Sequence, residues 1–348
     1  MNEIEDSHSR KPFRIAIVGG GLGGLALAIG LIRHGIGVHI YEAAATFSEI
    51  GAGVAFGPNS VRALGPTDES TLRGYKKHAT FNEGPKRQHT FLSLRYGMGS
   101  CNGNGKSFSF SKALVSVGEF PGEESGVNDV RLHFIDRSTA TASAIVGCDS
   151  IKSKTREAIL GNIEHGEFIN IVAVRRKNGA TWEDGQWVVP STKDEMLRDF
   201  GSWHPAVTNL LSHSLAQEEW ALFDLQHSAK YYKGTVYLLG DSAHASTPHI
   251  GASAGMAMED AFLLSSLAGA IRDQTELEKA FRAFNAVRRP RTQTVVEYSM
   301  LSGFAYEFMK DDVGDDFSRL QADISARFEW LWHEDLEAQL LKARKLMG

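Results

Sequence analysis

The feature that most constrains this chain is a glycine cluster between two short apolar segments near its beginning. Residues 13–18 (Phe-Arg-Ile-Ala-Ile-Val) are apolar and rich in β-branched side chains, which is typical of a buried parallel strand. The glycines follow, and the alanine-rich segment 22–34 predicts a helix that ends at Gly35. Residues 37–41 predict a second strand, which Glu42 follows directly. The order predicts a β-α-β unit within about thirty residues.

The glycines have the spacing of a dinucleotide-binding turn. Gly19 permits the tight turn, Gly21 lets the backbone approach a pyrophosphate, and Gly24 allows close packing of helix on strand. Glu42 lies about twenty residues further on, where a carboxylate accepts hydrogen bonds from ribose hydroxyls. An acid at this position favours NAD or FAD over NADP. The alternative is a glycine-rich turn without a ligand.

A second motif follows another apolar segment, residues 234–239, which predicts a strand. It begins with Gly240 and Asp241, continues through a loop of small residues, and leads into a helix predicted from about residue 254 to 271. An aspartate just after a buried strand can bind a polyol hydroxyl, and backbone amides in a small-residue loop can reach a flat ligand. The alternative is that Asp241 only caps a helix.

Composition excludes several classes of function. The net charge of −5 gives no basic excess for nucleic acid or an anionic membrane. The two cysteines are too few for a disulfide framework, and the 13 histidines show no paired spacing of a metal site. The beginning of the chain is polar and mixed in charge, unlike a signal peptide, and glycines interrupt the uncharged stretch 15–32. These features predict a soluble cytoplasmic protein that binds neither metal, nucleic acid nor membrane.

The two motifs together resemble those of the FAD-dependent aromatic hydroxylases, most closely the salicylate-hydroxylase-like branch. In that family the second motif runs G-D-A-A-H-A-x-x-P-x-x-G-x-G and closes with E-D-A, and residues 240–261 follow it almost throughout. The resemblance implies that Asp241 binds the ribitol chain of FAD and that Pro248 lies beside the isoalloxazine. It also implies that the amides of Gly251, Ala252 and Ser253 face the flavin pyrimidine.

His249 is the candidate for contact with the substrate. The resemblance places it at the reactive edge of the flavin, where it would help to bind a phenolate or carboxylate. The alternative is a histidine held there by loop packing. His244 is predicted to be structural, with hydrogen bonds inside its own loop.

A third family motif, D-G-x-x-S-x-x-R, has a weaker counterpart at residues 149–156. Asp149 and Arg156 keep the family spacing, but Ser150 replaces the glycine. The resemblance implies that Asp149 and Arg156 contact the flavin, and the alternative is the start of a surface helix. The chain also departs from the family, because the histidine-arginine helix expected after residues 97–106 is absent and a second stretch near residue 161 is short.

The fold class is therefore predicted as α/β. It comprises a Rossmann-type FAD-binding domain, a smaller β-rich substrate domain and C-terminal helices. The predicted boundaries are a flexible leader at 1–12, a discontinuous FAD domain at 13–85, 130–160 and 230–285, a shortened substrate domain at 86–129 and 161–229, and a C-terminal helical region at 286–348.

The resemblance implies a monooxygenase of secondary metabolism. NAD(P)H would visit transiently to reduce FAD, and molecular oxygen would form a C4a-hydroperoxyflavin that hydroxylates a salicylate-like or phenolic, including polyketide-derived, substrate. Two alternatives remain open. One is a flavin-binding protein whose hydroxylation is impaired by the shortened substrate domain, and the other is an NAD-dependent dehydrogenase that uses the first motif alone. The sequence does not predict the oligomeric state.

Several local expectations bear on the C-terminal half. The segment 276–287 is amphipathic, and Pro290 is predicted to interrupt its helix. Residues 329–347 predict one tail helix. The pair Arg288-Arg289 is predicted to lie on a solvated face. Further strands are predicted at 89–96, 130–134 and 168–174, and a hairpin turn at 182–187.

Overall fold

The chain divides into two compact units. The first combines residues 1–79 with 222–348, and the second comprises residues 80–221. The computed structural model describes residues 11–43, 54, 56–79, 173–175, 182–183, 185–214, 218–226 and 230–348, and the backbone alone at 114–121, 128–134 and 139–142. The predicted site residues Asp149 and Arg156 and the predicted strand 89–96 lie outside the described residues.

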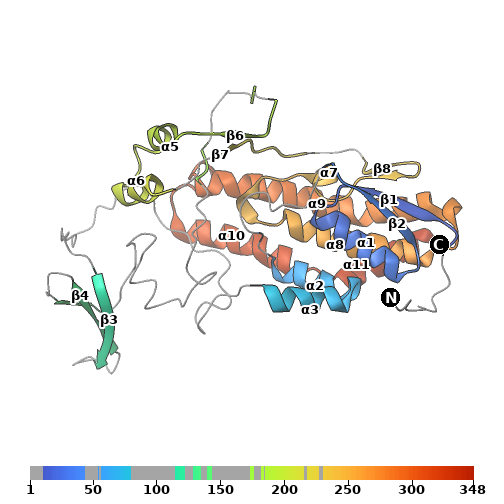
Figure 1. Ribbon diagram of the computed structural model, residues 1–348, viewed down its shortest axis with the longest axis horizontal. Helices are drawn as coiled ribbons and strands as arrows, with labels where there is room; N and C mark the ends of the chain where they lie inside the picture. The colour runs from blue at the N-terminus through green and yellow to red at the C-terminus, as the bar shows by residue number, and fades with distance from the viewer. Residues whose placement is uncertain are drawn as a thin grey trace, which may run out of the picture. The chain divides into compact units, whose positions relative to one another are not determined.

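The first unit begins with the predicted β-α-β arrangement (Figure 1). It consists of β1 (Arg14–Val18), α1 (Leu22–Arg33) and β2 (Gly37–Tyr41). The two strands pair in parallel, with Arg14 opposite Gly37 and Val18 opposite Tyr41. Helix α1 connects them, and the glycine turn lies between the end of β1 and the start of α1.

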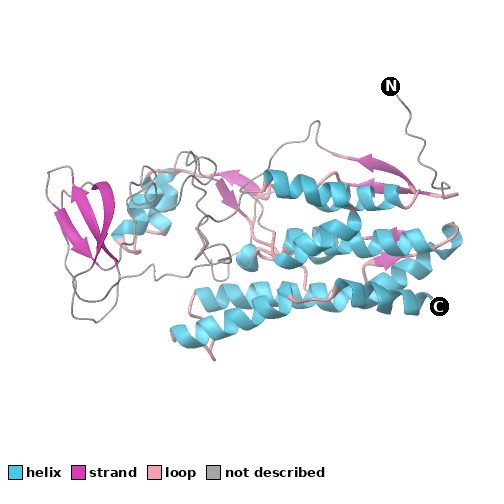
Figure 2. Cartoon of the chain, turned by 90° about the horizontal axis from the view of Figure 1, so that it is seen from below, coloured by secondary structure: helices cyan, strands magenta, loops and turns pink. Residues whose placement is uncertain are grey.

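Helices make up most of the rest of the first unit (Figure 2). They are α2 (Pro58–Thr67), α3 (Glu69–His78), α7 (Asp241–His244), the 3-10 turn η2 (Pro248–Ile250), α8 (Ser253–Ala270), the 3-10 turn η3 (Gln274–Glu276), α9 (Leu277–Tyr306), α10 (Phe317–Trp332) and α11 (Leu336–Met347). Helix α8 is buried on all sides from Gly255 to Ala268. A helix that turns no side to solvent over this length belongs in the centre of a core.

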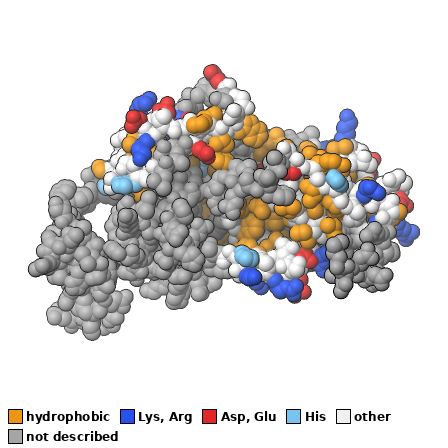
Figure 3. Space-filling view, viewed as in Figure 1, with side chains coloured by type: hydrophobic (Ala, Val, Ile, Leu, Met, Phe, Trp, Pro, Cys, Tyr) orange, Lys and Arg blue, Asp and Glu red, His pale blue; other side chains and the backbone are white. Residues whose placement is uncertain are grey.

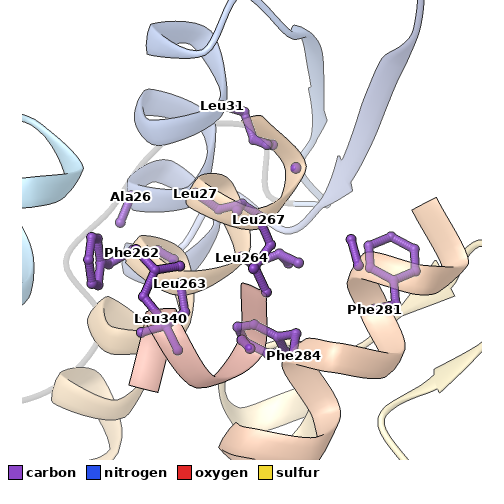
Figure 4. Close-up of a cluster of buried hydrophobic side chains, with 14 of the residues drawn as sticks. Ala26, Leu27, Leu31, Phe262, Leu263, Leu264, Leu267, Phe281, Phe284 and Leu340 are labelled. Atoms are coloured by element: carbon purple, nitrogen blue, oxygen red, sulfur yellow. The ribbon is translucent and has the colours of Figure 1, made fainter. Parts of the chain in front are cut away.

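The core of the first unit forms where α1, α9 and α11 pack around α8 (Figure 4). Its members include Leu27, Leu31, Leu263, Leu267, Phe284 and Leu340. Each is at most 7% exposed, and full burial of such a side chain stabilises the fold by about 1.5–3 kcal/mol. This packing fixes α1, and therefore the glycine turn at its start, against the helix that follows the second motif.

The strand predicted at 234–239 is mostly absent. Only β9 (Val236–Tyr237) is a strand, and it pairs antiparallel with β8 (Tyr232–Lys233). Gly234 has a φ of +57°, a left-handed conformation that glycine adopts readily and that reverses the chain here. The residues before Gly240 therefore form a short hairpin, and the parallel sheet of the described part of the first unit consists of β1 and β2.

Helix α9 continues through Pro290, which corrects the expectation that this residue ends it. A proline inside a helix removes one backbone hydrogen bond and costs about 3 kcal/mol. The neighbouring side chains of Val287, Arg288, Arg291 and Thr292 are all buried. Their tertiary contacts offset the cost and keep the helix continuous.

The predicted tail helix over 329–347 is two helices. Helix α10 ends at Trp332, and α11 begins after Asp335, whose Oδ1 accepts a hydrogen bond from the backbone N–H of Ala338 at 2.9 Å. An aspartate at this N-cap position starts a new helix because it satisfies an N–H group that the helix cannot.

In the described part of the second unit there are two small sheets and two helices. Strands β3 (Leu114–Pro121), β4 (Asn128–Phe134) and β5 (Thr139–Ala142) form an antiparallel sheet, which confirms the strand predicted at 130–134. Strand β6 (Val188–Pro190) pairs with β7 (Glu218–Trp220), and α5 (Lys193–Asp199) and α6 (Pro205–Ser212) lie between them in sequence.

The hairpin turn predicted at 182–187 is described at residues 182–183 and 185–187, which are not strand, and β6, which follows them, pairs with β7. Residues 176–181, which precede the predicted turn, lie outside the described residues, so the turn stays a prediction. The predicted strand at 168–174 is described only at 173–174, which are not strand either. In the described part of the chain, no helix is both long and apolar enough to cross a membrane.

Candidate functional site

The glycine turn holds the start of α1 directly against β1. Gly19 has a φ of +105°, a conformation that favours glycine because it has no Cβ. A Cβ added to Gly24 would overlap the carbonyl oxygen of Gly19 and lie 3.3 Å from Cγ2 of Ile17. Glycine at 24 therefore allows the close approach of helix and strand that this turn requires.

Gly21 differs from Gly24 because protein packing does not require it. A Cβ added there would meet no atom within 4 Å, and its φ of −69° suits any residue. It is the N-cap of α1, a position without a side-chain cap, and the first turn carries no acidic residue. The start of a helix offers unpaired N–H groups and a partial positive charge. The open space beside Gly21 therefore fits an anion such as a pyrophosphate.

Glu42 lies beside this turn. Its Oε2 accepts a hydrogen bond from the backbone N–H of Gly20 at 2.6 Å, and Tyr41 O accepts one from Gly19 N at 2.8 Å. The end of β2 thus supports the turn and brings a carboxylate to the place where the sequence predicts contact with a ribose.

The second motif begins with another glycine of positive φ. Gly240 has a φ of +64° and is the N-cap of α7, and Asp241 is the exposed first residue of that short helix. No side chain caps α7. Asp241 is therefore not the N-cap that the alternative expects, and the residue is exposed at the surface, while its contact with FAD stays a prediction.

The loop that follows leads to a second uncapped helix. Gly251 is left-handed with a φ of +58°, Ala252 is the N-cap of α8 without a side-chain bond, and the first turn of α8 has no acidic residue. Ser253 Oγ lies 2.7 Å from Ser246 Oγ, which ties the start of α8 back to the loop. Both long helices that follow the motifs thus begin in a way that favours negative charge.

The two motifs, far apart in sequence, meet at one residue of α8. A Cβ added to Gly23 would lie 3.0 Å from Cδ2 of Leu239 and 3.1 Å from the Cβ of Ala257, and one added to Gly240 would lie 3.5 Å from the same Ala257 Cβ. The fold therefore brings the first motif and the start of the second into one neighbourhood.

Pro248 and His249 follow in the short turn η2. Pro248 is exposed, and His249 is half-buried. The imidazole packs on α9, where a Cβ added to Gly303 would lie 2.8 Å from Cε1 of His249, and the Tyr306 ring centroid is 6.4 Å away. Burial raises the pKa of the Tyr306 hydroxyl. This packing is what the structural alternative for His249 requires, and its contact with a substrate stays a prediction.

Hydrophobic side chains are exposed around the glycine turn. Val18 is 88% exposed, Tyr41 56% and Leu22 48%, at the ends of both strands and the start of α1. Figure 3 shows exposed hydrophobic side chains on the face viewed in Figure 1. Apolar surface of this kind is typical of a place where a ligand or another part of a protein binds.

Known proteins resemble the chain along nearly all of its length. The family model described as FAD binding domain matches residues 208–299. The chain is 30% identical to 6-methylsalicylate 1-monooxygenase of Aspergillus terreus over 93% of this chain and 90% of the relative. It is 31% identical to a salicylate hydroxylase of Pseudomonas putida over 99% and 97%. A solved salicylate hydroxylase substrate complex matches with a TM-score of 0.67 and 25% identity, over 96% of this chain and 98% of the other.

This chain belongs to the FAD-dependent monooxygenase family. It is a flavoprotein oxidoreductase of the salicylate-hydroxylase type, which confirms the resemblance and the FAD cofactor inferred from the motifs. The family assignment favours neither of the alternatives, impaired hydroxylation or an NAD-dependent dehydrogenase.

The monooxygenase is shorter than its relatives within the matched span. Since 93% of 348 residues is about 324, about 80 of the 404 positions aligned with the Aspergillus terreus relative have no counterpart in this chain. These gaps lie inside the alignment, so they reflect internal shortening.

A buried charge cluster lies behind the second motif, and the sequence did not predict it. Glu259, Asp260, Arg288 and His244 are at most 2% exposed. The expectation that Arg288 is solvated is therefore wrong. Its spacing contained the signal, because Arg288 follows Phe281 and Phe284 on the apolar face of α9, and a charged residue on such a face needs a buried partner.

The cluster pairs two acids of α8 with two arginines of α9. Arg288 Nη1 donates to Glu259 Oε2 at 2.7 Å, and Arg288 Nε donates to Asp260 Oδ1 at 2.7 Å. Arg291 binds both carboxylate oxygens of Glu259 at 2.8 Å, and Asn59 Nδ2 donates to Glu259 Oε1 at 2.7 Å. Buried charges are stable only when paired and hydrogen-bonded in this way.

The cluster also determines the charge state of its members. Burial opposes ionisation of Asp260, but the Arg288 guanidinium and the His244 imidazole outweigh it and lower the pKa of that carboxyl to about 2. Burial likewise raises the pKa of Glu259, but Arg288 and Arg291 outweigh this effect and lower it. Both acids are therefore ionised at neutral pH.

His244 corrects a further expectation, because its hydrogen bond leaves the loop. Its Nε2 lies 2.7 Å from Asp260 Oδ2 on α8. Because an ionised carboxylate only accepts, Nε2 carries the proton and donates it. In the described residues, no group of three or more histidines, cysteines or acids is placed to hold a metal ion.

Proposed function

We propose that this monooxygenase hydroxylates a small aromatic substrate, salicylate-like or phenolic, and that it consumes NAD(P)H and molecular oxygen. The observation that carries the proposal is the approach of the first glycine turn and of Gly240, which precedes the exposed Asp241, to the same residue of α8, Ala257, together with the uncapped starts of α1 and α8. The names of the relatives, 6-methylsalicylate 1-monooxygenase and salicylate hydroxylase, supply the substrate class.

The residues of the first unit divide the binding of FAD between them. Gly19, Gly21 and Gly24 form the turn for the pyrophosphate. The Glu42 carboxylate accepts a hydrogen bond from a ribose hydroxyl, and the Asp241 carboxylate accepts one from a hydroxyl of the ribitol chain. The amides of Gly251, Ala252 and Ser253 face the flavin pyrimidine, where the start of α8 favours developing negative charge. Asp149 and Arg156 join this set through the family motif alone.

When bound, FAD supplies the redox chemistry, which no side chain can perform. The contribution of the chain is to orient the aromatic ring and to exclude water. Pro248 is exposed at the turn η2, so it can lie against the flavin. The imidazole of His249, held by its packing on Gly303, binds a phenolate or carboxylate of the substrate.

The domain assignment, the cytoplasmic location and the lack of nucleic-acid, membrane or metal partners are parts of the same proposal. The first unit contains the described FAD-site residues. The second unit contains β3, from the predicted substrate domain, together with most of β4 and all of β5, which belong to the segment 130–160 assigned to the FAD domain.

The first test is the spectrum and turnover of the purified protein. We expect a yellow protein that retains FAD and oxidises NAD(P)H faster when a salicylate, resorcinol or acyl phenol is added. Hydroxylated product is measured together with hydrogen peroxide, because peroxide without product would support impaired hydroxylation instead. A colourless protein that takes up no added FAD would contradict the proposal.

The second test is the variant Asp241→Ala. Because a carboxylate that binds a ribitol hydroxyl contributes about 1.5–3 kcal/mol, we expect FAD affinity to fall at least about tenfold. Asp311→Ala, at an exposed aspartate of the same unit, serves as the control and keeps wild-type affinity. Full FAD affinity in Asp241→Ala would show that the second motif is dispensable, as the dehydrogenase alternative requires.

A further inference from the structure

Asp260 holds both ends of the short helix α7. Its Oδ2 lies 2.7 Å from Nε2 of His244, the last residue of α7, and 3.3 Å from the backbone N of Gly240, the residue before α7. Asp241 is the first residue of that helix. One buried carboxylate therefore anchors the turn of backbone that carries the Asp241 side chain.

Asp260 is itself fixed on its other side. Its Oδ1 accepts a hydrogen bond from Arg288 Nε at 2.7 Å, and the same guanidinium binds Glu259. Arg288 is 0% exposed and lies in the middle of α9, which packs on α8. The position of α7 is thus defined by two long helices, and α7 alone, with four residues, is too short to hold its own geometry.

We propose that His244 and Asp260 are positioning residues for the flavin. They set the place of Asp241 through the α7 backbone, with Arg288 as their support, and they touch neither cofactor nor substrate. This inference rests on the proposed role of Asp241 in FAD binding. The alternative is that the hydrogen bond between His244 and Asp260 stabilises the core without influence on the flavin.

The test compares two substitutions of His244. Leucine keeps the approximate volume but donates no hydrogen bond, whereas the amide nitrogen of glutamine can take the place of Nε2. We expect His244→Leu to weaken FAD binding at least about tenfold, which is about 1.4 kcal/mol, and His244→Gln to restore most of the affinity. The dissociation constant is measured by flavin fluorescence on titration of the apoprotein.

Tyr231→Phe is the matched control. The Tyr231 hydroxyl is buried, lies 2.8 Å from Thr292 Oγ1 and accepts a hydrogen bond from Gln293, and the Tyr231 ring lies 5.9 Å from His244. Removal of the Tyr231 hydroxyl breaks buried hydrogen bonds in the same core, but it leaves the hydrogen bonds of Asp260 to His244 and Gly240 in place. We expect the melting temperature of the apoprotein to fall while FAD affinity stays at the wild-type value.

A double-mutant cycle separates positioning from general stability. If His244 acts through Asp241, His244→Leu combined with Asp241→Ala binds FAD no more weakly than Asp241→Ala alone. Additive losses would overturn the inference, as would a lower apoprotein melting temperature in His244→Leu with unchanged FAD affinity. Failure of the proposed function gives a different result, because Asp241→Ala alone would then keep full affinity.

Discussion

Gly21 and Gly24 lie one helical turn apart and have different reasons to be glycine. At residue 24 the neighbours are protein atoms, the carbonyl oxygen of Gly19 and the side chain of Ile17. At residue 21 the neighbour is open space at the start of an uncapped helix. Gly24 is therefore explained by the fold itself, and we propose that Gly21 is explained by a ligand.

Alanine at each position separates the two explanations. Because an added methyl group at Gly24 overlaps backbone, we expect Gly24→Ala to lower the free energy of unfolding by about 1–3 kcal/mol or more. Gly21→Ala should leave the melting temperature of the apoprotein within about 2 °C, because a loss below 0.5 kcal/mol shifts it little. Its methyl group occupies the space of the pyrophosphate, so FAD affinity should fall at least about tenfold.

Thermal unfolding of the apoproteins and titration with FAD measure both effects. An apoprotein of Gly21→Ala that is as unstable as Gly24→Ala would contradict the assignment, and so would wild-type FAD affinity in a folded Gly21→Ala protein.

At the scale of elements, α8 and α9 form the frame on which the site is built. Helix α8 is buried along most of its length, and α9 packs beside it through Arg288 and Arg291. Buried ion pairs contribute little net stability but are costly to break, because one partner is left unpaired in the core. The ion pairs of Arg288 and Arg291 therefore set the relative position of α8 and α9 more than they add to the stability of the fold.

The variant Arg288→Met tests this frame. It leaves two buried carboxylates with fewer partners, and we expect the free energy of unfolding to fall by about 3–5 kcal/mol. Arg282→Met is the same substitution at an exposed position of the same helix, and it should change stability by less than about 0.5 kcal/mol. Chemical denaturation of both proteins measures the free energy of unfolding. Equal losses in the two variants would show that the ion pairs of Arg288 do not form in solution.

At the scale of the whole molecule, the first unit is assembled from both halves of the chain. Residues 1–79 supply the glycine turn, and residues 222–348 supply Asp241, α8 and the buried cluster. The site therefore exists only after the unit has folded, and conditions that unfold the unit also remove the site.

Acid is one such condition, and Asp260 gives the direction of the effect. Its pKa in the folded protein, about 2, lies below the ordinary value of 3.8. Because its pKa is lowered on folding, the ionised Asp260 carboxylate stabilises the fold by about 2 kcal/mol above about pH 5. This stabilisation is lost as the pH falls toward 2 and the carboxylate is protonated.

The stability of Asp260→Asn should therefore depend less on pH across this range than that of the wild type. Unfolding in urea at a series of pH values measures the difference, with Asp311→Asn, at an exposed aspartate, as the control. A wild-type slope in Asp260→Asn would contradict the assignment of the low pKa.

The local sequence determined the β-α-β unit, because its signals act over short distances. Residues 14–18 and 37–41 form strands as their own composition predicts, and the positive φ at Gly19 is a conformation that favours glycine. The family motifs predicted FAD for the same reason, since the motif that begins with Gly240 and Asp241 is recognised from sequence positions alone. The FAD-dependent monooxygenase family was recognisable from these residues alone.

Only the tertiary structure decided the features that depend on partners distant in sequence. Pro290 would end an isolated helix, but the buried side chains around it keep α9 continuous. Arg288 would be solvated on an isolated helix, but Glu259 and Asp260 on α8 bury it. The sequence alone predicted which residues bind the flavin. Packing between distant segments determined how Asp241 is held, because a buried charge is stable only where its partners meet it.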